Sequence, residues 1–451
     1  MLRREHPWTT AAIAVVGLGL VAAACSNAEP TADDRDDEPA PADSEAEGDG
    51  DGGDEVVAVD EPGVTDSEIR VGGVASVTNP LDGKFGQAFD GVEAYFEMVN
   101  EEGGVHGREL ALAARRDDQV ANNDAEVRGL LEQDEVFAVL PVASLLFTGA
   151  DRLVQENVPT FGWTLNPEWQ GSDEEPKDNL FGQNGSFLGF DEASPLVPYL
   201  TDQVDASNVG LLAYTVSESS QCATGIERSF ERYAGPGSAK IVFGDKSLGF
   251  GVTDLSAQVS QMRDADVDFV ATCMDLQGVV TLAREMNRQS MDAVQYLPNG
   301  YDQELIDEFG DLFQGSYVLT QFSPFEVEDP PPGLEAYLEW MERTDTPTNE
   351  NTMNGWLSAA LFVEGLRQAG PDFSRQGVID AINQMTDWEA DGLLEGVDWT
   401  VEHTQAPRFV CNVVSLIDGD EFVPTFGGQP DEPFLCLDRN AEGRPEAVPE
   451  P

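Results

Sequence analysis

Residues 69–118 read IRVGGVASVTNPLDGKFGQAFDGVEAYFEMVNEEGGVHGRELALAARRDD, and this stretch decides the fold. Ile69 to Val74 is a short β-branched run, Phe85 to Glu101 is amphipathic, and Leu110 to Ala114 is again a short apolar run. Strand, helix and strand in this order are typical of a parallel sheet covered on both faces. The alternation continues with helices expected at Asn123–Gln133 and Phe147–Glu156 and a strand at Ala138–Pro141.

A second series of the same kind begins at Val209. The roughly 370 residues of the folded part exceed what one hydrophobic core usually holds, so we expect two α/β domains. The strands of the second series are expected at Val209–Tyr214, Ala239–Phe243 and Phe269–Cys273, and its helices at Gly225–Tyr233, Leu255–Ala265 and Val279–Arg288.

Two segments mark where the chain passes between the domains. Glycines interrupt Asn179–Ser194, and three prolines follow the strand-like run Tyr317–Phe325. Later helices are expected at Leu334–Met341, Trp356–Ala369 and Ser374–Met385, and strands near Arg408–Leu416 and Glu421–Thr425. The expected first lobe therefore comprises residues 67–184 and 323–390, the second lobe 185–322 and 391–438, and residues 439–451 a disordered tail.

The N-terminal region has the pattern of a secretory signal. Arg3 and Arg4 precede an apolar run from Ala11 to Val21, and small residues lead to Cys25. The run is too short to span a bilayer comfortably, which favours cleavage over retention. We therefore expect a signal peptide at residues 1–24. Residues 25–66, rich in Asp, Glu, Gly, Ala and Pro, are expected to form a disordered acidic tether.

The chain is strongly acidic. It has 85 Asp and Glu against 24 Lys and Arg, a formal net charge of −61. Such a surface repels nucleic acid and anionic membranes, so we expect no nucleic-acid partner, and membrane contact through a lipid anchor only.

Four cysteines remain once Cys25 is set aside, at positions 222, 273, 411 and 436. In an exported protein, an even number of cysteines indicates disulfides. Three pairings are open, and we favour Cys222 with Cys273 and Cys411 with Cys436, because each pair brackets one compact stretch. No metal site is expected, since there is no CxxC spacing and the histidines, His6, His106 and His403, are scattered.

Catalytic motifs are missing from the sequence. It contains no GxSxG, HExxH or P-loop, and no GxGxxG follows a strand. We therefore expect no cofactor and no enzymatic activity.

Several segments together resemble the type I periplasmic binding proteins of the leucine/isoleucine/valine-binding family. Gly86 to Asn100 matches the spacing of the family's first helix, and Glu102 to Arg108 its N-x-x-G-G-I-x-G-R turn. Val158-Pro159 and Phe181 resemble the family's third strand and first hinge. Further similar segments are Trp356–Gly370 and the closing pattern with Gly392, Gly396, Trp399 and His403. Val21 to Cys25 also resembles the bacterial lipobox, which implies acylation of Cys25; ordinary cleavage leaving a free thiol is the alternative.

The resemblance implies a Venus-flytrap fold of two Rossmann-like lobes joined by a three-strand hinge. It implies a monomeric lipoprotein on the outer face of the cell membrane that captures an amino acid, or a related amide or carboxylate, for an ABC transporter permease. A ligand-sensing co-receptor using the same clamp is the alternative.

Candidate ligand-binding residues lie where parallel strands end, because helix N-termini gather there. By the resemblance, Ser144 holds a ligand carboxylate, with helix N-capping as the alternative role, and Thr164 contacts the ligand amine or carboxylate. Asp275 and Asp302 are candidates for binding an ammonium group, although a solvated surface carboxylate is the commoner case. Trp163 and Tyr301 are candidates for an apolar wall, or simply for core packing. The remaining candidates at strand ends are Ser76, Thr78 and Ser219.

The ligand stays open at this level. Ala75 to Pro80 departs from the family's P-L-T-G, and Leu140 to Ser144 from its G-P-x-S-S. Amino acids, amides, urea-like molecules and small aromatic acids all remain compatible with the sequence.

Overall fold

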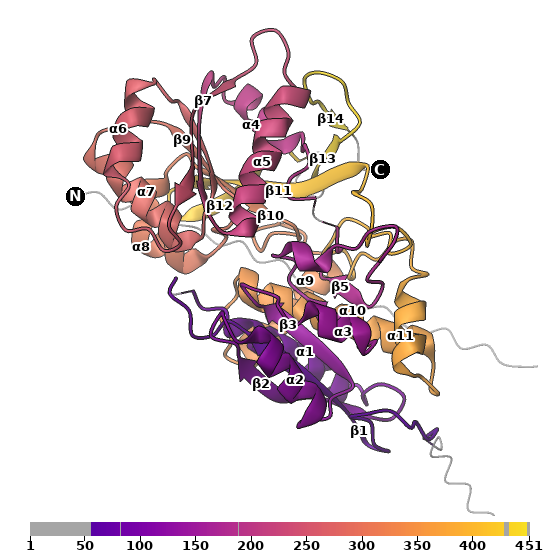
Figure 1. Cartoon of the computed structure of the whole chain (residues 1–451). Helices are drawn as coiled ribbons and strands as arrows, with labels where there is room; N and C mark the ends of the chain where they lie inside the picture. Colours follow the sequence, from indigo (N-terminus) through magenta and orange to yellow (C-terminus); the bar gives the residue numbers. More distant parts are fainter. Residues whose placement is uncertain (1–55, 82, 188, 428–432, 449–451) are drawn as a thin grey trace, which may run out of the picture. The chain divides into compact units, whose positions relative to one another are not determined.

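The β-branched runs at the start of the folded part form one parallel sheet in the computed structural model, which describes residues 56–427 except 82 and 188, and residues 433–448 (Figure 1). The strand order is β2-β1-β3-β4-β5, and every pair is parallel. The strands are β1 (Glu68–Ala75), β2 (Glu109–Asp117), β3 (Ala138–Ala143), β4 (Thr160–Gly162) and β5 (Leu180–Gly182).

Helices cover both faces of this first sheet because its strands are apolar on both sides. Val71 belongs to the core under α1 (Gln87–Glu101) and α10 (Glu350–Ala369). Val74 belongs to a separate core under α2 (Asn123–Glu132) and α3 (Ala150–Gln155). The other elements near this sheet are the 3-10 helix η1 (Pro167–Trp169), α9 (Pro332–Arg343) and α11 (Arg375–Ile382).

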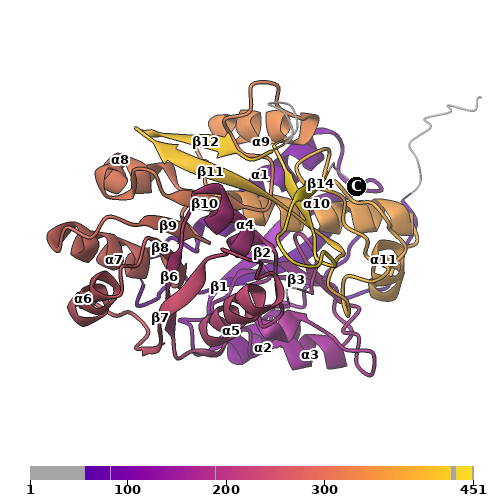
Figure 2. The same cartoon turned by 90° about the horizontal axis from the view of Figure 1, so that it is seen from above.

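The second sheet is mixed, with the order β14-β13-β11-β10-β9-β8-β6-β7 and β12 paired to β11. Strands β6 to β10 run parallel, and β11 turns the remaining edge antiparallel. In both views α6, α7 and α8 lie on one side of the sheet and α4 and α5 on the other (Figure 2). The strands are β6 (Asn208–Tyr214), β7 (Lys240–Leu248), β8 (Phe269–Cys273), β9 (Val294–Leu297), β10 (Tyr317–Thr320), β11 (Phe409–Asp418), β12 (Glu421–Thr425), β13 (Leu435–Asp438) and β14 (Ala447–Val448). The helices are α4 (Leu196–Gln203), α5 (Ser217–Arg232), α6 (Ser256–Asp264), α7 (Leu276–Arg288) and α8 (Gln303–Phe313).

The two-sheet α/β fold expected from the sequence is confirmed, and the chain passes between the sheets after β5, after β10 and before β11. An aromatic cluster joins two of these passages. The centroid of the Phe181 ring in β5 lies 5.3 Å from that of Trp399 and 5.3 Å from that of His403, and both of these residues precede β11. Burial lowers the pKa of His403 to about 4, so its ring is neutral at physiological pH.

The ordered part of the chain extends beyond two of the expected boundaries. Residues 56–66 were expected in the tether, but the buried Arg108 guanidinium donates to the carbonyls of Val57 and Thr65, each at 2.6 Å. Residues 439–448 were expected in the tail, but Ala447 and Val448 pair with β13. The signal segment, Cys25 and tether residues up to 55 lie outside the described residues. The division into lobes stays a prediction.

Both predicted disulfides are present, Cys222–Cys273 and Cys411–Cys436. The first ties α5 to the end of β8, and the second ties β11 to β13. In the part of the chain described, no helix has the length and apolar character needed to cross a membrane.

Two glycines allow a close contact between α1 and α10. A Cβ on Gly355 of α10 would lie 1.9 Å from the carbonyl oxygen of Ala88, and one on Gly91 of α1 would lie 1.9 Å from that of Thr352. The two backbones therefore touch where a side chain would stand. Tyr95 and Trp356 pack edge-to-face beside this contact, with ring centroids 4.8 Å apart.

We predict that Gly355→Ala destabilises the protein by about 2–3 kcal/mol, because the added methyl group must push the two helix backbones apart. Gly310→Ala in α8 is the matched control, since its Cβ would meet nothing closer than 3.5 Å; it is expected to be neutral, or stabilising by up to about 1 kcal/mol. Denaturant unfolding of both variants measures the difference. Equal stability of the two variants would contradict the packing described.

Candidate functional site

Two adjoining cavities open where parallel strands of both sheets end. Their volumes are about 360 Å³ and about 330 Å³. The residues that line both are Leu81, Leu145, Trp163, Leu165, Asp275, Asn299 and Glu350. We treat them as one space, called the strand-end cavity. Its size suits a small organic ligand.

Apolar side chains form most of the wall. Trp163 follows β4, Tyr214 ends β6, and Met274 follows β8. Tyr214 packs edge-to-face on Phe250, with ring centroids 5.5 Å apart. Such a wall favours a ligand with an apolar body, which desolvation would stabilise in the cavity.

Four helices begin at the cavity, and each carries an acidic residue at or next to its start. The acids are Glu218 of α5, Asp275 before α7, Asp302 before α8 and Glu350 of α10. The positive end of a helix dipole stabilises a carboxylate at this position. The chain therefore supplies its own negative charge where four helix dipoles converge.

Burial makes these carboxyl groups harder to ionise. It raises the pKa of Glu218 and of Asp302. Burial, and then the negative charge of Asp302, raise the pKa of Glu350 to about 8. Glu350 therefore holds a proton through much of the neutral range when the cavity is empty.

Six predicted site residues line the strand-end cavity. They are Trp163, Thr164, Ser219, Asp275, Tyr301 and Asp302. Three of them use their hydroxyl groups in the fold. Thr164 donates to the side-chain oxygen of Asn184 at 3.4 Å. Ser219 donates to the carbonyl of Cys273, and Tyr301 donates to Glu326 at 2.5 Å and accepts from the Phe325 amide at 2.6 Å. Ligand contact by the six stays a prediction.

Ser76, Thr78 and Ser144 are not among the residues that line the cavity. Ser76 donates to Asp118 at 2.7 Å, and the Ser144 hydroxyl accepts from Asn123 at 3.1 Å. Both serines are buried within the first sheet's strand ends, so their hydroxyl groups hold loops together. Thr78 is exposed, and its backbone amide donates to Asp117 at 3.0 Å.

Sequence reasoning missed several residues of the wall. Leu81, Tyr214 and Phe250 carry no chemical motif, and only the strand ends beside them gave a signal. Glu350 could have been found, because the Asn349-x-x-Thr352 spacing marks a helix start. Asn349 accepts from the Thr352 amide at 3.1 Å, and α10 begins six residues before the expected Trp356.

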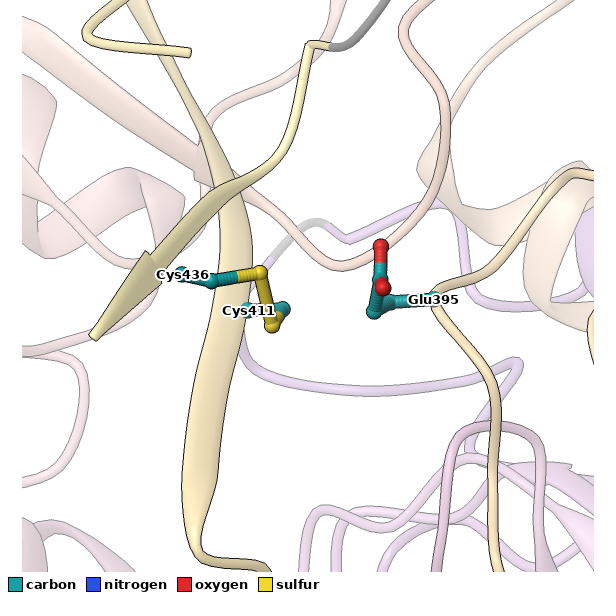
Figure 3. A group of neighbouring side chains, drawn as sticks. All are labelled: Glu395, Cys411 and Cys436. Carbon is teal, nitrogen blue, oxygen red and sulfur yellow. A yellow bond between two sulfur atoms is a disulfide. The ribbon is translucent and has the colours of Figure 1, made fainter. Parts of the chain in front are cut away.

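A further cavity of about 470 Å³ lies at the passages between the sheets, and two residues of a possible metal-binding group, Glu395 and Cys411, line it. Glu395 lies beside Cys411 and Cys436, with ligand atoms within 4.8 Å of one another (Figure 3). The two sulfurs are bonded to each other, so neither is a thiolate that could hold a metal ion. The strand-end cavity is therefore the stronger candidate for a ligand site, since strand ends and helix N-termini converge there.

Comparison with known proteins agrees with this geometry. A family model described as periplasmic binding protein matches residues 68–414. No curated protein sequence matches the chain.

Solved structures share the fold at low sequence identity. A branched-chain amino acid ABC transporter protein from Thermus thermophilus with bound valine is 19% identical, with a TM-score of 0.66 over 80% of this chain and 95% of that one. A fatty acid ABC transporter substrate-binding protein from Thermomonospora curvata is 21% identical, with a TM-score of 0.64 over 81% and 93%. A solute-binding protein from R. palustris in complex with 4-hydroxybenzoate is 15% identical, with a TM-score of 0.63 over 80% and 96%.

We predict that Glu350→Gln changes how the stability of the ligand-free protein depends on pH. A carboxyl whose pKa rises from 4.5 to about 8 on folding contributes stability below about pH 4.5, and this contribution is lost as the pH rises through 8. The glutamine variant does not suffer this loss. It should melt higher than the wild type near pH 9 and at about the same temperature near pH 5.

Thermal melting over a pH series, with the exposed Glu339 of α9 changed to Gln as the control, measures this difference. The interpretation would be wrong if the two melting curves of wild type and Glu350→Gln ran parallel at every pH.

Proposed function

Because the chain belongs to the periplasmic binding protein family, we propose that it captures a small molecule in the strand-end cavity and delivers it to the permease subunits of an ABC transporter. The family is one of binding proteins, which agrees with the expectation that the chain is not an enzyme. The observation that carries the proposal is the cavity itself, since loops of both sheets line it.

The position of the cavity suits capture by closure. A ligand between two groups of loops gains contacts from both, so the closed arrangement is stabilised only when the cavity is filled. Lys84, in the loop after β1, forms a salt bridge with Glu304 at the start of α8. This salt bridge links the loops of the first sheet to those of the second. Both side chains are substantially exposed, so this pair contributes little by itself and does not hold the cavity shut without ligand.

The N-terminal region supports a place outside the cytoplasm. We propose that the signal segment directs export, and that acylated Cys25 anchors the chain to the outer face of the cell membrane. The acidic tether would then hold the folded part away from the lipid surface. We further propose that the protein acts as a monomer, which leaves its surface free to meet the permease.

We predict that a ligand raises the melting temperature of the purified chain by mass action, with about 2.7 kcal/mol of stabilisation at a hundredfold excess over the dissociation constant. The panel should include amino acids, amides, amines, fatty acids and aromatic acids. Small-angle scattering of the same samples should show compaction with the compound that shifts the melt. A folded protein that no compound stabilises would contradict capture and favour a partner-binding role.

Trp163→Ala tests the place of binding. Loss of the indole from the wall should lower the affinity for the stabilising compound at least about tenfold, which corresponds to about 1.4 kcal/mol of binding free energy. Leu145→Ala is a second test. Leu145 also lines the cavity but is less buried than Trp163, so its substitution disturbs folding less if loss of the indole proves too disruptive. Unchanged affinity in both variants would place binding elsewhere.

A further inference from the structure

Two of the four helix starts at the strand-end cavity, those of α7 and α8, are already occupied by the chain's own acids. Asp275 accepts from the Gln277 amide at 2.9 Å, and Asp302 accepts from the Glu304 amide at 2.8 Å. A free helix N-terminus attracts an anion, but here a ligand carboxylate would meet a protein carboxylate in its place. Two sites that could hold a ligand carboxylate are therefore closed to it.

Ser144, which was expected to hold a carboxylate, and Ser76, a further candidate, also have their hydroxyl groups occupied. The Ser76 hydroxyl donates to Asp118 and accepts from the Leu145 amide at 3.0 Å. The Ser144 hydroxyl contacts Asn123 and the Val74 carbonyl, at 3.1 and 3.5 Å. Neither hydroxyl is left to donate into the cavity.

Positive charge is scarce at the cavity. Among the described residues that line the cavity, Lys84 alone is basic, and it forms a salt bridge with Glu304. The described wall carries six acids, namely Glu218, Asp275, Asp302, Glu304, Glu308 and Glu350. A bound carboxylate would lose its hydration without gaining a free cation, which is costly in a partly buried site.

Two neighbouring acceptors lack a donor. No hydrogen bond or ion pair to the Glu350 carboxyl is made by the described residues. The adjacent Asn351, which also lines the cavity, has a buried side-chain oxygen without a hydrogen-bond partner. The Glu350 side chain is half-buried, and the Asn351 oxygen is buried. Because a buried acceptor is normally satisfied, this site fits a ligand that brings donors. An ammonium group brings three and a positive charge.

We propose that the ligand is a cationic amine with an apolar or aromatic body and no carboxylate. This inference rests on the proposed capture function and names its substrate class. The ammonium group lies among Glu350, Asn351 and Asp302, and the apolar body lies against Trp163 and Leu145, which line the same space. A charge-assisted hydrogen bond to a desolvated carboxylate is among the stronger contacts available to such a ligand.

Two series of three compounds test the proposal on the purified chain by calorimetry. Each series keeps one body and changes only the charged groups. The aromatic series is 2-phenylethylamine, phenylalanine and 3-phenylpropionate, and the aliphatic series is isoamylamine, leucine and 4-methylpentanoate. At least one amine is expected to bind, its amino acid at least about tenfold more weakly, and its acid weakest of all.

The Glu350→Gln variant assigns the contact. It should weaken the bound amine about tenfold near pH 8.5, whereas Glu339→Gln on the exposed face of α9 should not. In the wild type, affinity should rise between about pH 6 and about pH 8.5, because a cation binds the ionised carboxyl and Glu350 must first release its proton. Loss of this rise in the variant separates a direct contact from a change of fold. The other charged groups around Glu350 are Asp302, Lys84, Glu304, Glu308, Asp275 and Glu218.

The outcomes separate this inference from the capture function. Tighter binding of an amino acid or acid than of its amine overturns the inference and leaves capture standing. If neither amine binds at millimolar concentration while another compound stabilises the fold, the inference again fails alone. If nothing in the wider panel binds, both fail.

Discussion

The backbone contact between α1 and α10 fixes the position on which the site depends. At Gly91 and Gly355 the two helices approach closer than any side chain would permit. Glu350 is the first residue of α10 and lies about one and a half turns from Gly355, so this contact determines where its carboxyl stands. A residue far along the chain is thereby held beside the loops that follow β1 and β3.

The helix dipoles and the buried carboxylates oppose each other at this position. Each dipole favours a negative charge at its N-terminus, while burial disfavours it. Burial prevails at Glu218, Asp302 and Glu350, because the pKa of each of these carboxyls is raised. No described residue forms an ion pair with Asp302 or Glu350, although the positive charge of Lys84 partly offsets the effect of burial on the pKa of Asp302. In an ordinary core such groups would be paired or replaced by apolar residues.

The sequence predicted the sheets better than the cavity. Strands such as Ile69–Val74 and Phe269–Cys273 are short apolar runs, and the residues that identify them are neighbours in the sequence. The structure has them as β1 and β8. The capping box at Asn349 was overlooked because the helical pattern was read from Trp356 onward. The hydroxyl groups of Ser76 and Ser144 point into loop networks formed by partners 21 to 70 residues away, and no local pattern reports such partners. Ser144 occupies the loop position at which the resembling family binds its ligand, but its hydroxyl group holds the loop together.

Because no described residue pairs with the Glu350 carboxyl or the Asn351 side-chain oxygen, the ligand-free protein is less stable than it could be, and a ligand that supplies the partner would recover that free energy. A protonated Glu350 and an unpartnered Asn351 oxygen each forgo interactions that water or a cation would supply. Filling the cavity with an amine would restore both, and the gain exists only when loops of both sheets surround the ligand. The same groups that lower the stability of the ligand-free protein would thus drive closure on the ligand. Because apolar walls exclude water from the contact, this electrostatic gain would survive high salt better than an exposed ion pair such as Lys84–Glu304.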